Sequence, residues 1–258
     1  MVAPWPRESY VAGGGAGEVA LIALSSTRLP DPLPVSRLRH GMPDDGDGPG
    51  AISLVARDRD ADPTWFEEQV LTPFTELIAA DLGPDAAALA LAAQHAYVID
   101  VRLDDPDDLG HIQAAWALAK CVCEEGAAVV IDVYAARAHL GSEVAALPAE
   151  REFDVMHEVT LFFDEQPDGM LAAWSLGLRK FGRPDLVLIG VSPDNATESA
   201  LLLRDVAATL ASGERVDPGD TIGAPDGRRL VAERFDPTTS AVVAVDDRPA
   251  LVLRADNG

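Results

Sequence analysis

The chain has 258 residues, of which 48% are hydrophobic and 24% are charged, and its mean hydropathy is +0.06. This length suffices for one large domain or two small ones, and the composition excludes a wholly disordered or fibrous chain. With 43 acidic and 20 basic residues the formal net charge is −23, which excludes a large nucleic-acid-binding surface.

The sequence favours a cytoplasmic protein that does not enter a membrane. No apolar run reaches the roughly 18 residues of a membrane-spanning helix. Residues 1–10 lack the basic start and the continuous apolar core of a signal peptide. Cys121 and Cys123 cannot pair with each other on a helix without distortion, and two thiols outside a disulfide framework suit a reducing compartment.

The excess of carboxylates has three explanations that the sequence leaves open. All the basic residues except Lys120 and Lys180 are arginine, and alanine and aspartate are abundant, as in proteins from genomes of high GC content. A dense carboxylate surface also keeps a protein soluble at high salt. The third explanation is an acidic surface that caps a basic partner, such as a toxin.

Strands and helices alternate in the pattern of the N-terminal half. Residues 1–17 contain a run of glycines and are expected to form a flexible leader. Periodicity and turn residues then predict a strand at 18–26, a loop at 29–50, a strand at 51–56, helices at 63–82 and 84–93, a strand at 97–103, a helix at 106–125 and a strand at 128–134. Asp62-Pro63 and Asp105-Pro106 are typical helix starts, and Pro73 should kink or split the first helix.

The C-terminal half is predicted to be richer in strands. The pattern gives strands at 158–163, 170–178, 185–191, 229–235, 241–245 and 250–254, and a helix at 195–213. Residues 166–169 (QPDG) suit a type I turn between the first two of these strands. The side chains expected in the core are Trp116, Leu118, Val129, Ile131, Leu161, Leu188, Ile189 and Leu203.

This order of elements predicts an α+β fold in which helices pack on one face of a mixed β-sheet. We expect residues 18–258 to form a single domain. The order also fits two ferredoxin-like halves, at 18–140 and 153–258.

The string Val-Ile-Asp-Val occurs at 98–101 and again at 130–133, on two strands that flank one helix. The carboxylates of Asp100 and Asp132 would lie within about 5 Å of each other on neighbouring strands, and about 10 Å apart if a third strand lay between them. Burying a carboxylate is costly, so we expect both on the solvated face or rim of the sheet and not in a metal site.

Motifs of known catalytic chemistry are missing from the sequence. It contains no phosphate-binding loop, no dinucleotide-binding glycine pattern after a strand and no nucleophile elbow. The histidines lack metal-ligand spacing, and Cys121 and Cys123 fit buried thiols better than zinc ligands. His157 and Glu158 would point to opposite faces of a strand. We therefore predict no catalytic residue, no metal site and no cofactor.

The segment 174–185 concentrates the polar chemistry of the chain, because it brings three basic residues into five positions. Its glycines and aromatic residues predict a basic, glycine-hinged loop that could hold a carboxylate or phosphate group. The candidate ligand-binding residues are Trp174, Ser175, Arg179, Lys180, Arg183 and Asp185. The alternative is a structural connection in which Gly177 or Gly182 takes a positive φ, Phe181 turns inward and the bases pair with nearby acids.

Residues 177–186 (GLRKFGRPDL) resemble the G-[LM]-x-[KR]-[FC]-G-x-P-[DE]-[LIV] signature of certain bacterial domain families of unknown function. The resemblance extends over residues 95–212. Members of those families often carry His-Thr before the glycine, where this chain has Trp174-Ser175, so the one acid/base group of the motif is absent here. The resemblance implies a related fold and a bacterial origin, and no reaction.

These observations favour a non-catalytic binding or interaction protein whose partner is a basic protein, with no role for nucleic acid or membrane. The alternative is an enzyme or small-anion sensor with a site around residues 174–185. A pocket lined by Arg179, Arg183 and a carboxylate would favour the alternative, and a flat acidic face would favour the binding protein.

Overall fold

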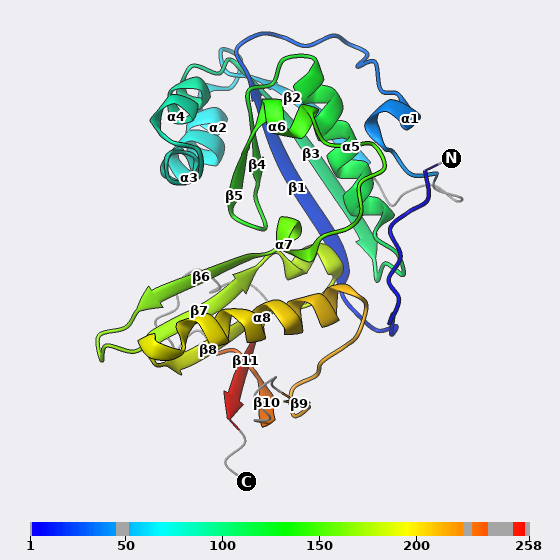
Figure 1. The fold of residues 1–258 in the computed structure, drawn as a ribbon. Helices are drawn as coiled ribbons and strands as arrows, with labels where there is room; N and C mark the ends of the chain where they lie inside the picture. Colours follow the sequence, from blue (N-terminus) through cyan, green and yellow to red (C-terminus); the bar gives the residue numbers. More distant parts are fainter. Residues whose placement is uncertain (1, 45–51, 224–228, 237–249, 256–258) are drawn as a thin grey trace. The chain divides into compact units, whose positions relative to one another are not determined.

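The computed structural model describes residues 2–44, 52–223, 229–236 and 250–255, and the chain divides into two compact units (Figure 1). Unit 1 comprises Met1–Pro6 and Gly17–Phe153, and unit 2 comprises Arg7–Ala16 and Asp154–Gly258. Each unit combines helices with its own β-sheet, which confirms the predicted α+β class.

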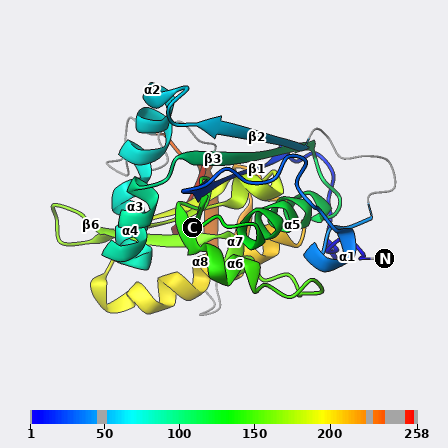
Figure 2. The ribbon, with the colours of Figure 1, turned by 90° about the horizontal axis from the view of Figure 1, so that it is seen from above.

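Unit 1 is built on a five-stranded sheet in the order β2-β3-β1-β4-β5. Its strands are β1 (Ala16–Ser25), β2 (Ile52–Asp58), β3 (His95–Asp104), β4 (Val129–Asp132) and β5 (Arg137–Leu140). Its helices are α1 (Arg37–His40), α2 (Pro63–Phe66), α3 (Thr72–Leu82), α4 (Pro84–Leu91), α5 (Gly110–Glu124) and α6 (Gly141–Ala145). The pairs β2–β3, β1–β4 and β4–β5 are antiparallel, and Figure 2 shows β2, β3 and β1 side by side.

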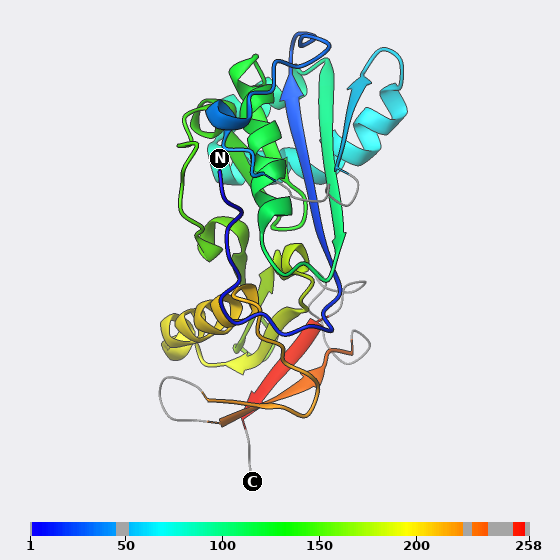
Figure 3. The same cartoon turned by 90° about the vertical axis from the view of Figure 1, so that its right-hand side faces the viewer.

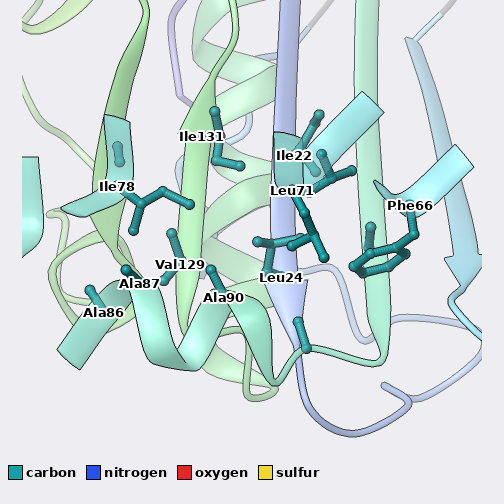
Figure 4. Packing of buried hydrophobic residues seen from close by; sticks show 14 residues of the cluster. Ile22, Leu24, Phe66, Leu71, Ile78, Ala86, Ala87, Ala90, Val129 and Ile131 are labelled. Carbon is teal, nitrogen blue, oxygen red and sulfur yellow. The ribbon is translucent and has the colours of Figure 1, made fainter. Parts of the chain in front are cut away.

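Helices cover both faces of this sheet, whereas we expected them on one (Figures 1 and 3). The cause is the continuous apolar run of β1, which is buried on both faces over residues 19–25. On one face, Ile22 and Leu24 belong to a hydrophobic cluster with Ile78 of α3 and Ala90 of α4 (Figure 4). On the other face, α5 packs against β3, and its residues 111–123 are all buried.

The predicted helix at 63–82 is split, as Pro73 requires. Asp62 caps α2 by accepting a hydrogen bond from the Trp65 N–H at 3.2 Å, and Pro63 occupies the first helical position. A π-helical segment, η1 (Glu67–Leu71), then precedes α3. This wider turn accommodates a proline that has no N–H to donate to the preceding turn. Gly83, with a φ of 87°, separates α3 from α4.

The start of α5 differs from the prediction. Asp105 has a φ of 41° and α5 begins only at Gly110, so Asp105-Pro106 does not start the helix. The side chain that reaches the helix start belongs to Asp108, whose Oδ1 accepts a hydrogen bond from the Gly110 N–H at 2.8 Å. The N-cap position itself is occupied by Leu109, so no aspartate caps α5 in the way expected of Asp105.

The repeated Val-Ile-Asp-Val string does not form a carboxylate pair. Strand β1 lies between β3 and β4, so Asp100 and Asp132 are not on neighbouring strands. Asp100 is exposed, as predicted. Asp132 is fully buried, which contradicts the prediction. Its Oδ1 accepts a hydrogen bond from the Ala135 N–H at 3.0 Å, which offsets part of the cost of burying the carboxylate.

Unit 2 is built on a six-stranded sheet in the order β6-β7-β8-β11-β10-β9, in which β8 and β11 are parallel and the other neighbours are antiparallel. Its strands are β6 (Thr160–Glu165), β7 (Leu171–Leu176), β8 (Asp185–Val191), β9 (Thr221–Gly223), β10 (Arg229–Arg234) and β11 (Ala250–Ala255). Its helices are α7 (Val155–Glu158), α8 (Ala196–Ala211) and the 3₁₀ turns η2 (Leu178–Phe181) and η3 (Pro193–Asn195). Helix α8 packs against β7 and β8.

Most strands of unit 2 lie where the sequence predicts them, and the turn at 166–169 connects β6 to β7. Ile189 was expected in the core but is 43% exposed, and Leu161 is only half-buried. Strand β9 was not predicted. The strand predicted at 241–245 lies outside the described residues.

The N-terminal stretch that we expected to be a flexible leader makes defined contacts within unit 2. The N–H groups of Ser9 and Val11 donate to the carbonyls of Ser212 and Gly213, each at 3.0 Å. The buried Arg7 side chain donates to the carbonyls of Leu210 and Ala211 at the end of α8. A cation at a helix C-terminus is favourable, because the last carbonyls carry partial negative charge.

Cys121 and Cys123 are free thiols buried in α5. Burial, followed by the carboxylates of Glu125 and Glu124, raises the pKa of Cys121 to about 11 from its ordinary 9.0. Burial, followed by Cys121, raises the pKa of Cys123 to about 12. Both thiols are therefore protonated at neutral pH, and a thiol without thiolate character is a poor nucleophile.

We expect both thiols to react with a disulfide reagent at pH 8 at least about a hundredfold more slowly in the folded protein than in urea, because reaction requires local opening.

The free energy of unfolding should fall as the pH rises above 9.0, because the thiols of the unfolded chain ionise there while those of the folded chain stay protonated. The Cys121→Ala/Cys123→Ala variant should show a smaller fall between pH 9 and 11. Rapid labelling of the thiols in the folded protein would contradict their expected slow reaction.

Candidate functional site

The segment 177–184 connects β7 to β8 through a tight turn. Gly177 and Gly182 have φ values of 121° and 64°, and Phe181 is fully buried, as the structural alternative predicted. Both glycines are also sterically required. A Cβ at Gly177 would collide with the carbonyl oxygen of Glu158, and one at Gly182 with that of Gly15.

Lys180 of this turn forms a buried ion pair with Glu158 at the end of α7. The Lys180 Nζ lies 2.7 Å from Glu158 Oε2, and the two side chains are 0% and 1% exposed. Glu158 Oε1 lies 3.1 Å from His157 Nδ1. The side chains of His157 and Glu158 thus lie together, contrary to the strand-based prediction, because these residues are on a helix. An ion pair so thoroughly enclosed serves the fold and leaves its ammonium inaccessible to a ligand.

Arg183 is buried and holds backbone carbonyls. Its Nη2 donates to the carbonyls of Gly213 at 2.7 Å and Val11 at 3.1 Å, and its Nε donates to the carbonyl of Glu214 at 2.9 Å. These carbonyls belong to the chain after α8 and to the N-terminal stretch. The guanidinium thereby links three segments of unit 2 by hydrogen bonds. Its planar shape and several donors allow it to bind more than one carbonyl at once.

Ser175 and Asp185 form a buried pair at the base of the turn. Asp185 Oδ1 accepts hydrogen bonds from the Ser175 hydroxyl at 3.2 Å and from the Leu178 N–H at 3.1 Å. The Ser175 hydroxyl in turn accepts from the Leu186 N–H at 2.9 Å. Ser175 is 0% and Asp185 1% exposed, so neither reaches a substrate in solution.

The aromatic member of the predicted set is Trp174, whose ring stacks on Phe162 of β6 with centroids 5.6 Å apart. Arg179 is the one member of the set that is partly exposed; the other five are buried. The structure therefore brings Ser175 and Asp185 together and directs Lys180 and Arg183 to other partners. These contacts favour a structural turn, and a ligand-binding role for the six residues stays a prediction.

An acidic surface on the helices of unit 1 was missed in the sequence. Glu67 and Glu68 of η1, Glu76 and Asp81 of α3, and Asp85 of α4 are each exposed, in different directions around these helices, and we call them together the acidic helix surface. Arg57 and Arg59 lie over the rings of Trp65 and Phe66 of α2. Exposed leucines, Leu89 at 52% and Leu91 at 49%, follow on α4. The signal in the sequence was the absence of lysine and arginine between Arg59 and Arg102.

Unit 1 also contains a groove of about 410 Å³ lined by apolar residues together with Arg28 and Asp31, a volume within the range of ligand sites. It lies between the segment 28–35 and the strands β2 and β3, and we call it the β2 groove. Its lining includes Leu29, Leu33, Val35, Leu54 and Tyr97. The Tyr97 hydroxyl accepts a hydrogen bond from the Leu29 N–H at 2.7 Å, which anchors the start of the segment to β3.

Among the described residues, no group of three or more histidine, cysteine, aspartate or glutamate side chains is arranged to hold a metal ion. None of the helices in the described part of the chain is long and apolar enough to cross a membrane. Comparisons of the chain with protein-family models, with curated proteins and with solved structures found no match. The resemblance of residues 177–186 to bacterial domain families stays a prediction.

Proposed function

We propose that this chain is a non-catalytic binding protein whose partner presents a basic surface. The acidic helix surface carries the proposal, because exposed carboxylates follow one another there over a stretch without lysine or arginine. Such a surface attracts a basic partner, speeds its association and repels acidic competitors. The formal net charge of −23 adds to this selection at longer range.

The burial and hydrogen bonding of the reactive side chains support a non-catalytic role. Ser175 and Lys180 are fully buried, and both are bonded to carboxylates of unit 2. A nucleophile or a general acid must approach a substrate within hydrogen-bonding distance. Two side chains so enclosed meet that requirement only if the turn opens.

A small-anion sensor is the second candidate, and one observation favours it. Trp174 Nε1 and Thr160 Oγ1 are buried on the neighbouring strands β7 and β6, and neither atom has a hydrogen-bond partner among the described residues. Both groups can donate a hydrogen bond, and a buried donor without an acceptor costs free energy. A bound carboxylate or phosphate would supply that acceptor.

We also propose a cytoplasmic location in a bacterium. Two free, buried thiols suit a reducing compartment, and the resemblance of residues 177–186 to bacterial domain families supports the origin.

The test is capture of partners from native lysate at low salt, followed by affinity measurement on the purified partner. Neutralising Glu67→Gln, Glu68→Gln and Glu76→Gln should weaken binding about tenfold, since each charge contributes a fraction of a kcal/mol. The matched control removes three exposed charges from unit 2, by Asp164→Asn, Glu165→Gln and Glu198→Gln, and should change the affinity by less than about threefold.

Raised salt should weaken the unaltered complex and have less effect on the neutralised one, because exposed charges are screened. A partner without a basic surface would contradict the proposal, as would equal binding by the neutralised variant and the unaltered protein. If the chain is a small-anion sensor, phosphate or succinate should slow hydrogen exchange around Thr160 and Trp174 equally in both variants.

A further inference from the structure

Strand β2 is one of the two edge strands of the unit 1 sheet, and among the described residues it pairs with β3 alone (Figure 3). Its register with β3 is regular over all seven residues, without a bulge. Ile52, Ser53, Leu54, Val55 and Ala56 form a run without charge or proline. Natural edge strands usually carry a charge, a proline or a bulge that prevents pairing, because their free backbone groups can otherwise pair with another chain.

The β2 groove lies over one face of this strand. Leu54 and Ala56 line it together with Tyr97 of β3. Because successive side chains of a strand point to opposite faces, Val55 lies on the other face of the sheet, where it is 42% exposed. A strand added beside β2 would therefore place alternate side chains toward the groove and the others beside Val55.

The charge around β2 indicates which strand would fit. Strand β2 itself carries Arg57 and Asp58, and the chain after it continues through Asp60 and Asp62 to Glu67 and Glu68, with Arg59 as the only base before Arg102, so acids outnumber bases here. Arg28 and Asp31 in the lining of the groove offset each other. A second copy of this chain would bring another −23 to the contact and would be repelled. A segment with alternating apolar residues and flanking bases complements both the groove and the acidic helices.

We propose that the partner binds through such an extended segment, which adds to the edge of β2 as a sixth strand of the unit 1 sheet. This inference rests on the proposed function and names the partner's binding element. Main-chain hydrogen bonds to β2 would supply affinity, and the groove would select apolar side chains at alternate positions.

Hydrogen exchange of the full chain tests the inference with a synthetic peptide, acetyl-Arg-Val-Thr-Val-Arg-Val-Thr-Val-Arg-amide. At about 1 mM peptide, where even weak complexes form, exchange of the amides in residues 52–58 should slow at least about threefold. A peptide N-methylated at alternate residues keeps the charge but loses donors to β2, and it should bind at least about tenfold more weakly, the loss of one or two hydrogen bonds.

Ala56→Arg provides the matched variant. Ala56 is exposed, so the substitution should fold, and it fills the groove with a charge that repels the peptide. The affinity should fall about tenfold. Leu201→Arg adds the same charge at a position on α8 that is 44% exposed and should change the affinity by less than about twofold.

The outcomes separate this inference from the proposed function. Protection confined to residues 63–91 would overturn the strand site while leaving a basic partner for the acidic helices. Equal binding by the N-methylated peptide would also overturn it, and so would protection of β2 that rises with protein concentration without peptide, which would reveal self-association. If no basic peptide or protein binds anywhere, both proposals fail.

Discussion

Replacing Lys180 with methionine should lower the free energy of unfolding of unit 2 by about 3–5 kcal/mol, because the Glu158 carboxylate would remain buried without its ammonium partner. Glu158→Gln should cost a similar amount, by leaving the ammonium without its carboxylate. Urea denaturation provides the measurement, followed by hydrogen exchange of the unit 2 amides, because three of the four tryptophans belong to unit 1 and fluorescence would not report on unit 2 alone.

The double variant Lys180→Met/Glu158→Leu is the informative comparison. Once both charges are gone, no uncompensated charge is buried, so the loss should be well below the sum of the two single losses. Arg204→Met is the surface control, because Arg204 pairs with Asp205 while 46% exposed, and it should cost less than about 1 kcal/mol. If the loss of the double variant equalled the sum of the two single losses, a coupled, buried pair would be contradicted.

Arg183→Ala should destabilise unit 2 by about 3–5 kcal/mol, because several charge-assisted hydrogen bonds are lost together, at about 1.5–3 kcal/mol each. The carbonyls of Gly213 and Val11 would lose their shared donor. Arg183→Lys should recover little of this stability, because an ammonium cannot reproduce the fork of the guanidinium. Hydrogen exchange should quicken at residues 7–16 and after α8.

The same variant separates a structural role from a ligand-binding one. If Arg183 is structural, stability falls while binding of the basic partner by the remaining folded protein is unchanged. Arg179→Ala, at the partly exposed arginine of the same turn, is the companion variant. Full stability with lost ligand binding in Arg183→Ala would restore the anion site that the sequence suggested.

Local patterns predicted most elements of the fold. The glycine conformations at Gly177 and Gly182, the split helix at Pro73 and the cap at Asp62 all followed from the chemistry of single residues. The position of α5 was less well predicted, because an Asp-Pro pair specifies a turn as readily as a helix start. The burial of Asp132 and the exposure of Ile189 depend on which elements cover each face, which a strand pattern alone does not contain.

The candidate site was predicted less well than the fold. A concentration of bases in an acidic chain pointed to residues 174–185, but Lys180 and Arg183 are directed to Glu158 and to distant carbonyls that no spacing in the sequence identifies. The only sign of the acidic helix surface in the sequence was the absence of lysine and arginine between Arg59 and Arg102. The β2 groove is formed by segments far apart in the chain, so only the tertiary structure reveals it.

The division of the chain between the units has a consequence for its synthesis. Residues 7–16 are synthesised about two hundred residues before their hydrogen-bond partners at residues 210–213. Unit 1 can therefore fold during translation. Residues 7–16 of unit 2 stay without their hydrogen-bond partners until α8 has been synthesised. A shortened chain that begins at the first strand would lose Arg7 and the carbonyl of Val11, and with them two attachments at the end of α8.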